Sequence, residues 1–237
     1  MLWYKAWLET RFGLAFLFGL FTLVWLVAST GARLAPAKQA LKPQELAFLA
    51  DAFAFPFIAA AISLAGTGIK TPSGGFQNQV KGLHGSTLYT LSLPVSRPKL
   101  VGIRATVGLL ETAVVIVVFT LVGWWLFPET MQNTLGEILA HFSVTFICSS
   151  TFYFLSLFLA TFLDDGLRLP GAMTILAILF ALDATKILPP YLNVFRPMGS
   201  ASPLITHAIP WITLTVALAA SAVFFLATIK IVQSQEY

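Results

Sequence analysis

Ionisable side chains stand inside the long apolar stretches of this chain, and they are its first candidates for chemistry. Asp51, Asp183 and Lys186 lie near the ends of such stretches. A charge in lipid is costly, so residues of this kind usually pair with one another or line a path for a substrate or ion. Asp183 and Lys186 are three residues apart, which allows a local ion pair on one helical face. These three residues are therefore candidates for a structural role or for lining a pathway or interface.

Four further ionisable residues, Arg104, Glu111, Glu137 and His141, have spacings that fit helical neighbours. Glu111 follows Arg104 on the same face, about 10 Å further along a helix that rises about 1.5 Å per residue. This favours a structural tie to Arg104 or to a neighbouring helix over proton transfer. Glu137 and His141 are one turn apart and could share a proton or bind a metal ion. A plain capped helix end is the favoured interpretation of that pair.

The motifs of self-contained enzymes do not occur in the sequence. It has no Gly-x-x-x-x-Gly-Lys-[Ser/Thr] phosphate loop, no His-Glu-x-x-His and no Gly-x-Ser-x-Gly elbow. The histidines His84, His141 and His207 are far apart in sequence, and the single cysteine, Cys148, excludes an intramolecular disulfide or a cysteine metal cluster. We therefore expect no catalytic residue, cofactor site or metal site in this chain.

The composition predicts an integral membrane protein. The 237 residues are 57% hydrophobic and only 10% charged, whereas a soluble domain carries about 25% charged residues. Lys and Arg outnumber Asp and Glu by 14 to 10, but they form no basic run, so nucleic acid is not an expected partner. The lipid bilayer is.

Six apolar stretches approach the roughly 20 residues that a bilayer core requires. They predict an all-α, polytopic membrane protein with spans at about residues 12–28, 46–69, 101–127, 135–163, 170–188 and 211–232, forming a single transmembrane domain over residues 1–237. Pro170 suits the first turn of the fifth span.

Two segments outside these spans have their own character. Residues 1–11 set Trp3 and Trp7 against Lys5 and Arg11, which is typical of an amphipathic helix lying at the membrane surface. Residues 189–210 are too polar and too rich in proline to span, and they predict short interfacial turns or helices in an extracytoplasmic loop.

The basic residues predict the orientation, because Lys and Arg concentrate on the cytoplasmic side. With six spans and the amino terminus inside, nine of the 14 lie on that side: Lys5, Arg11, Lys70, Lys81, Arg97, Lys99, Arg104, Arg168 and Lys230. The outside holds Arg33, Lys38, Lys42, Lys186 and Arg196. We therefore expect a multi-pass protein of the cytoplasmic (inner) membrane with both termini in the cytoplasm.

The longest polar interruption, residues 70–100, contains the stretch Gly85-Ser-Thr-Leu-Tyr-Thr-Leu-Ser-Leu-Pro-Val-Ser-Arg97. Its pattern predicts a short amphipathic helix that Ser86 caps and Pro94 ends. An amphipathic turn between two spans offers a surface to a cytosolic partner, although an interfacial helix lying on the headgroups has the same pattern.

This layout, together with the residues Leu91-Ser-Leu-Pro-Val-Ser-Arg97, resembles the permease subunits of ABC-2 type exporters. The resemblance covers the whole chain in layout, but only that stretch carries it at the level of residues. It implies that the cytosolic loop holds a coupling helix, with Ser86, Thr87, Leu88, Tyr89, Leu91 and Ser92 contacting a separate ATPase subunit that binds ATP and Mg. Family members commonly carry an acidic residue ahead of a Gly-Thr pair, where this chain has Lys81-Gly-Leu-His-Gly-Ser-Thr87.

Two classes of function follow. The first is the permease half of an ATP-driven exporter, which is no enzyme itself, pairs with a second copy or a close relative, and alternates access when the ATPases close. The resemblance also implies that the second and fifth spans, with Asp51 and Asp183, lie nearest the dimer axis. The alternative is a membrane enzyme or membrane-embedded scaffold without an ATPase.

Overall fold

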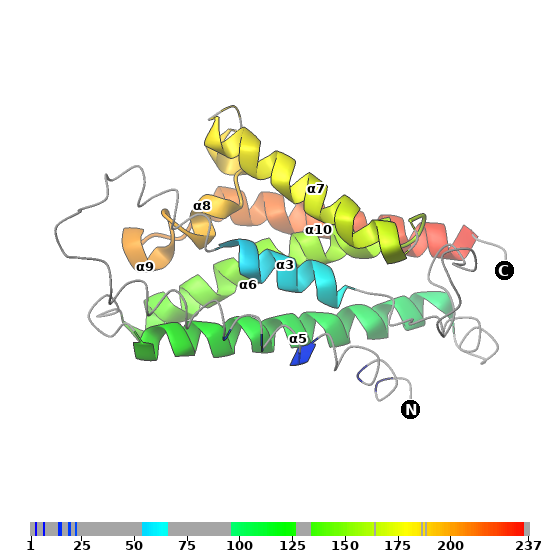
Figure 1. Cartoon of the computed structure of the whole chain (residues 1–237), viewed down its shortest axis with the longest axis horizontal. Helices are drawn as coiled ribbons and strands as arrows, with labels where there is room; N and C mark the ends of the chain where they lie inside the picture. Colours follow the sequence, from blue (N-terminus) through cyan, green and yellow to red (C-terminus); the bar gives the residue numbers. More distant parts are fainter. Residues whose placement is uncertain are drawn as a thin grey trace.

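A computed structural model (Figure 1) describes residues 54–65, 96–126, 134–163, 165–185 and 189–234 of the chain, with Trp3, Trp7, Leu14, Ala15, Gly19, Thr22 and Ile187. Every element within these ranges is a helix. The expected surface helix 1–11 and first span fall almost entirely outside the described residues, and the proposed coupling stretch 86–92 falls wholly outside them.

Five helices form the body of the part of the chain that the structure describes. They are α3 (Ala54–Leu64), α5 (Arg97–Leu126), α6 (Leu135–Leu159), α7 (Asp165–Ala184) and α10 (Trp211–Ser234). Successive helices run in opposite directions, so that α3, α6 and α10 run toward the end of the bundle at which α5 and α7 begin (Figure 1). We call this the Ser234 end of the bundle and the other the Trp211 end.

Three of these helices are long and apolar enough to cross a membrane. They comprise residues Pro98–Leu121 within α5, Leu135–Leu159 and Trp211–Ser234. The described part of α3 is a shorter apolar helix of 11 residues. The described residues thus support an all-helical, membrane-like protein with three candidate spans, and six spans remain an expectation.

The predicted boundaries hold within a few residues for α5, α6 and α10, but the start of the fifth span is corrected. α7 begins at Asp165 and contains Pro170 in its interior, whereas the sequence suggested a start at Pro170. Proline lacks the N–H that a helix interior uses, so α7 forgoes one backbone bond near its start. Thr174 donates its hydroxyl to the Pro170 carbonyl one turn on (2.8 Å).

The proline-rich segment between α7 and α10 folds into three short helices, as predicted. They are the 3-10 helix η2 (Pro190–Leu192), α8 (Phe195–Met198) and α9 (Pro203–Thr206). Proline stands in the first turn of η2 and of α9, where its missing N–H has no intrahelical partner to lose. This segment lies at the Trp211 end (Figure 1).

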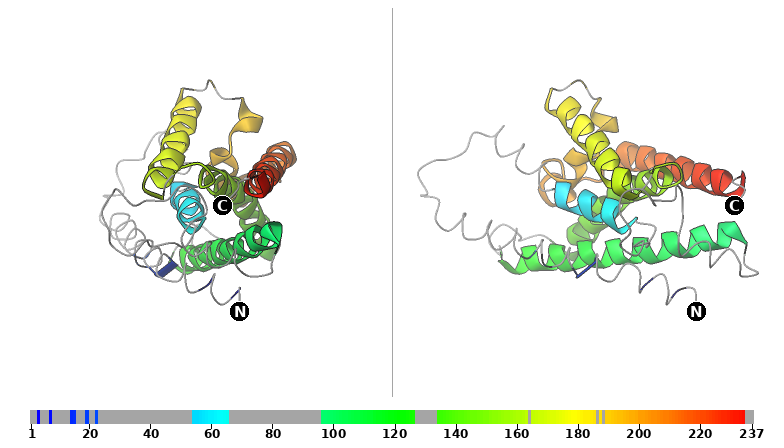
Figure 2. Two further views of the ribbon diagram at one scale, coloured as in Figure 1. Left: turned by 90° about the vertical axis from the view of Figure 1, so that its right-hand side faces the viewer. Right: turned by 45° about the vertical axis from the view of Figure 1, so that its right-hand side comes forward.

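Helix α6 is central to the packing. It lies against α3, α5, α7, α8, α9 and α10, and viewed along the bundle the other long helices surround it (Figure 2). Its side chains Tyr153 and Leu157 join one buried cluster with α3 and α5, whereas Val144, Cys148 and Phe152 join a second with α3, α7 and α8. The single cysteine, Cys148, is buried in this second cluster.

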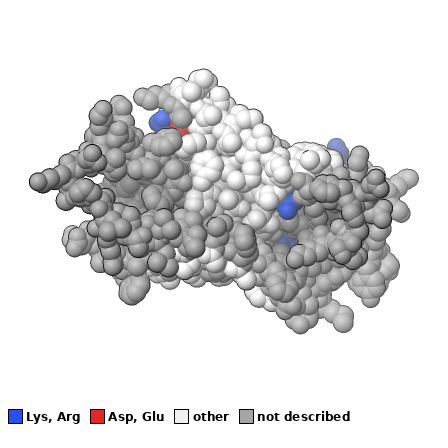
Figure 3. All heavy atoms as spheres, viewed as in Figure 1, with Lys and Arg blue, Asp and Glu red and all other residues white. Residues whose placement is uncertain are grey.

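Apolar side chains also cover the outside of the bundle. On α5 the exposed residues Leu110, Val114, Val117 and Leu121 follow one another at intervals of three and four, which places them on one helical face. The central part of the surface in Figure 3 shows no Lys, Arg, Asp or Glu atom among the described residues. Such a surface suits the hydrocarbon core of a bilayer.

Candidate functional site

Polar side chains gather at two levels of the bundle, and the first lies toward the Ser234 end. Arg168, in the first turn of α7, is buried and donates Nη1 to the carbonyl of Ile62 on α3 (3.1 Å) and to Ser156 Oγ on α6 (2.8 Å). Ser156 donates its own hydroxyl to the same carbonyl (3.1 Å). We call this triangle of bonds, which joins three helices, the Arg168 clamp.

Tyr153, one turn before Ser156 on α6, extends this polar region toward α5. Its hydroxyl donates to the carbonyl of Arg104 (3.2 Å). Arg104, Glu111 and Arg168 all lie close enough to interact electrostatically with the Tyr153 hydroxyl. Glu111 is buried and takes part in contacts of its own, which agrees with a structural role for this carboxylate.

The second level, at the Trp211 end, contains Asp183. This carboxylate is buried near the end of α7, where Oδ1 accepts a hydrogen bond from Nδ2 of the fully buried Asn193. Nε of Arg196 lies 3.4 Å from the same oxygen. Asn193 Oδ1 in turn accepts from the backbone N–H groups of Phe195 (2.9 Å) and Arg196 (3.3 Å). From the position before the N-cap residue Val194, the Asn193 side chain therefore binds the first N–H groups of α8 and joins this helix to α7.

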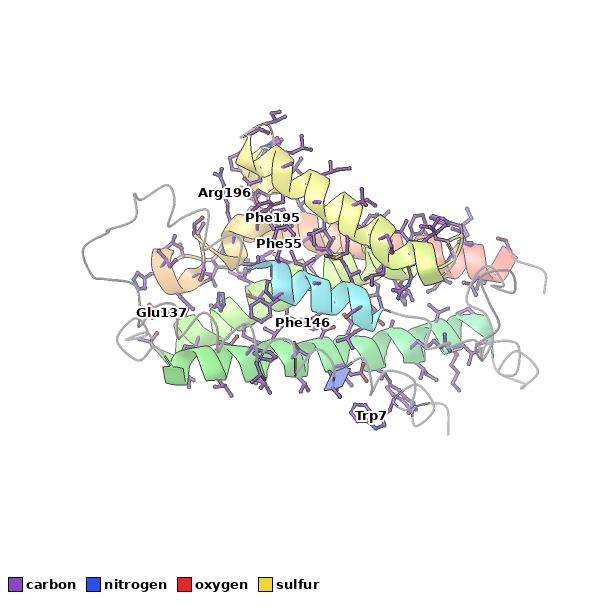
Figure 4. The ribbon with its side chains drawn as sticks, viewed as in Figure 1. Trp7, Phe55, Glu137, Phe146, Phe195 and Arg196 are labelled. Atoms are coloured by element: carbon purple, nitrogen blue, oxygen red, sulfur yellow. The ribbon has the colours of Figure 1, made fainter. Side chains whose placement is uncertain are left out.

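Aromatic rings pack beneath this polar network. Phe195 is fully buried, stacks on Phe55 of α3 with ring centroids 5.7 Å apart, and meets Phe180 of α7 edge to face at 5.3 Å. Figure 4 shows Phe55 and Phe195 together, with Arg196 beside them. The short helix α8 thus inserts an apolar anchor between α3 and α7 while its polar start binds Asp183.

The start of α6 holds the remaining polar contacts at this end. Thr134 and Glu137 form a reciprocal capping box, in which Glu137 N–H donates to Thr134 Oγ1 and Thr134 N–H donates to Glu137 Oε2. This is the capped helix end that the sequence favoured. Glu137 Oε1 also lies 2.5 Å from Nδ1 of His207.

His141 faces α9 and not Glu137. Its Nδ1 lies 3.0 Å from Ser202 Oγ, and Ser202 accepts from the N–H of Leu204 (3.1 Å) to cap α9. His207, at the other end of α9, has a left-handed backbone (φ 54°). Both ends of α9 are therefore bound to α6 through a histidine.

The contacts at the two levels involve only some of the site residues that the sequence predicted. Asp51 and Lys186, like Ser86, Thr87, Leu88, Tyr89, Leu91 and Ser92, lie outside the described residues. Asp183 has contacts in the following segment that its sequence spacing did not indicate. The sequence pattern did not single out Arg168, Ser156, Asn193 or Ser202 as site residues. Ser202 carried one local signal, since serine is a preferred N-cap residue and Ser202 is the N-cap of α9.

Within the described ranges, no three His, Cys, Asp or Glu side chains come close enough to hold a metal ion. The polar groups of both levels instead bind helix ends and carbonyls of neighbouring helices, an arrangement that fixes helix positions. No protein-family model, no curated protein and no solved structure matches this chain.

Proposed function

We propose that this chain is the transmembrane permease subunit of an ATP-driven exporter of the ABC-2 type, with its ATP-hydrolysing engine in a separate chain. The observation that carries the proposal is the antiparallel order of the helices (Figure 1). α3 runs toward the end of the bundle at which α5 begins and α10 ends (Figure 1), and α3 and α5 flank the polar segment 66–95 in the sequence. A cytosolic ATPase bound to that segment would thus act on the ends of several helices at once.

The buried polar contacts support this function in a second way. Within the described ranges three helices are long and apolar enough to span, yet buried charges stand between helices at both levels of the bundle. Because such groups are costly in a membrane, they usually mark functional positions. Contacts of this kind can exist in two discrete arrangements, which a transporter that alternates access requires. In this proposal the chain lies in the cytoplasmic membrane with both termini inside.

A second permease copy, or a close relative, completes the proposed transporter. Ala60 and Ala61 of α3 are fully buried in the core of the chain itself, so they are not surfaces for a partner. α7 is the fifth span, which the family resemblance places near the dimer axis, and its Ile178 is 54% exposed and therefore accessible to a partner. We therefore assign α7 to the interface between copies.

This assignment predicts a specific crosslink. In a Cys148→Ala background, Ile178→Cys should form disulfide-linked dimers in native membranes under mild oxidation. Val223→Cys on α10 is a matched control, because Val223 is comparably exposed (63%) on a different helix, and it should crosslink several-fold less. The reverse pattern would contradict the assignment. Mass spectrometry of the crosslinked band separates a pair of identical chains from a pair with a relative.

The proposed contact with the ATPase predicts the effect of a charge within residues 86–92. Leu88→Asp or Leu91→Asp should reduce the ATPase that co-purifies at least several-fold, because a carboxylate would face an apolar surface of the partner. The chain should still insert into the membrane. Thr90→Asp, within the same stretch but outside the predicted contact set, is the control and should retain the partner. Variants at Leu88 and Leu91 that bind the ATPase and export normally would place the contact elsewhere.

Measuring the ATPase that co-purifies also tests the alternative function, a membrane enzyme or membrane-embedded scaffold. Under that alternative no ATPase accompanies even the unmodified chain.

A further inference from the structure

The Arg168 clamp has a chemical feature that packing alone does not require. Arg168 lies in the first turn of α7, where the exposed N–H groups give the helix a partial positive charge and disfavour a cation. It is only 7% exposed. A buried residue that is unfavourable for its own helix usually has a functional role outside that helix.

The carbonyl that Arg168 binds lies at the end of α3. Ile62 is in the last turn of that helix, where the partial charge is negative and a guanidinium is favourable. Segment 66–95 begins directly after it. The clamp therefore fixes the last turn of α3, which directly precedes that segment in the sequence.

Ser156, like Arg168, forms its hydrogen bonds with neighbouring helices. Ser143 and Ser150 of α6 donate their hydroxyls back to carbonyls of α6 itself, the usual behaviour of a helical serine. Ser156 donates to Ile62 of α3 and accepts from Arg168 of α7. Each group in the triangle thus connects two different helices.

We infer that the Arg168 clamp transmits movement of segment 66–95 to α6 and α7, with Arg168 as the positioning residue; this inference rests on the proposed function. An N–H···O hydrogen bond joins atoms about 2.7–3.2 Å apart and is lost at about 3.6 Å, and a buried guanidinium that loses its acceptors is strongly unfavourable. The end of α3 can therefore move only together with α6 and α7. In this inference, displacement of segment 66–95 moves α3 and, through the clamp, α6 and α7.

The test uses the complete permease–ATPase complex with spin labels at the Trp211 end, far from the clamp. Labels at Ala181 of α7 and Ile212 of α10, both exposed, in a Cys148→Ala background report the distance between these helices. We expect ATP with vanadate to shift this distance. Arg168→Met should remove most of the shift, Ser156→Ala should reduce it about twofold, and Arg168→Lys should recover part of it. Lys230→Met, which removes an exposed cation at the Ser234 end, should leave the shift unchanged.

Assembly separates the two proposals. Each variant is first checked for bound ATPase and for its midpoint of thermal unfolding. Should Arg168→Met fail to assemble, Ser156→Ala decides, because it removes only one hydroxyl. A full shift in either variant that carries bound ATPase would overturn the transmission role and leave the proposed function standing. A complete absence of ATPase from the unmodified chain would instead overturn the proposed function.

Discussion

Replacing Asn193 with aspartate should strongly destabilise the protein. Asn193→Asp keeps the oxygen that binds the first N–H groups of α8 but puts a second carboxylate beside the buried Asp183. Leaving a buried charge without compensation costs about 3–5 kcal/mol. We expect a sharp fall in the midpoint of thermal unfolding in detergent, and little folded protein in the membrane fraction.

A charge exchange provides the matched control. The double variant Asp183→Asn with Asn193→Asp restores one amide and one carboxylate at the same two positions. Aspartate at 193 still accepts from the N–H groups of Phe195 and Arg196, and the amide at 183 can donate to it. This variant should recover most of the lost stability. Equal damage in the single and double variants would show that the Asp183–Asn193 contact does not hold α8 to α7.

The second large effect is expected at Gly108 on α5. A Cβ at this position would lie 2.6 Å from Cε2 and 2.7 Å from Cζ of the Tyr153 ring. Tyr153 is fully enclosed and its hydroxyl is bound to Arg104, so the ring has little room to retreat. Overpacking of this kind costs about 1–3 kcal/mol. Gly108→Ala should therefore lower the unfolding midpoint, although alanine favours a helix over glycine by about 1 kcal/mol.

Gly102 makes this prediction specific, because it lies on the same helix and an added Cβ there meets nothing within 4 Å. Gly102→Ala should leave the midpoint unchanged or raise it. The cost of Gly108→Ala should also largely disappear in a Tyr153→Leu background, as a double-mutant cycle would show. A Gly108→Ala variant as stable as Gly102→Ala would contradict the close packing of α5 on α6.

The sequence predicted helices well where apolar length alone determines them. The starts of α6 and α10 agree with the structure because Thr134 and Pro210 mark clear boundaries before long apolar runs. The start of α7 was placed too late, because Pro170 was interpreted as a boundary although a helix tolerates the loss of one backbone bond. The three-residue spacing of Asp183 and Lys186 predicted an ion pair within one helix. That pair stays a prediction, because Lys186 lies outside the described residues.

The polar contacts between helices could not be predicted in the same way. Asn193 is ten residues from Asp183, and Ser156 is 94 residues from Ile62, so neither pair follows from helical periodicity. The role of Arg168 depends on where α3 ends, and the apolar pattern predicted a second span continuing to about residue 69. Short caps such as Ser202 were visible as residue types, but their histidine partner on α6 depends on how the segment 189–210 folds back.

The most direct test of the proposed function is to isolate the chain from its own membranes and measure ATP hydrolysis with and without its partner. We expect a tagged chain in mild detergent to bring with it a second protein that contains a phosphate loop, and the complex to hydrolyse ATP in the presence of Mg. The chain stripped of that protein should hydrolyse none, because its sequence has no phosphate loop. Hydrolysis by the pure chain, or a chain that never binds an ATPase, would contradict its assignment as a permease subunit.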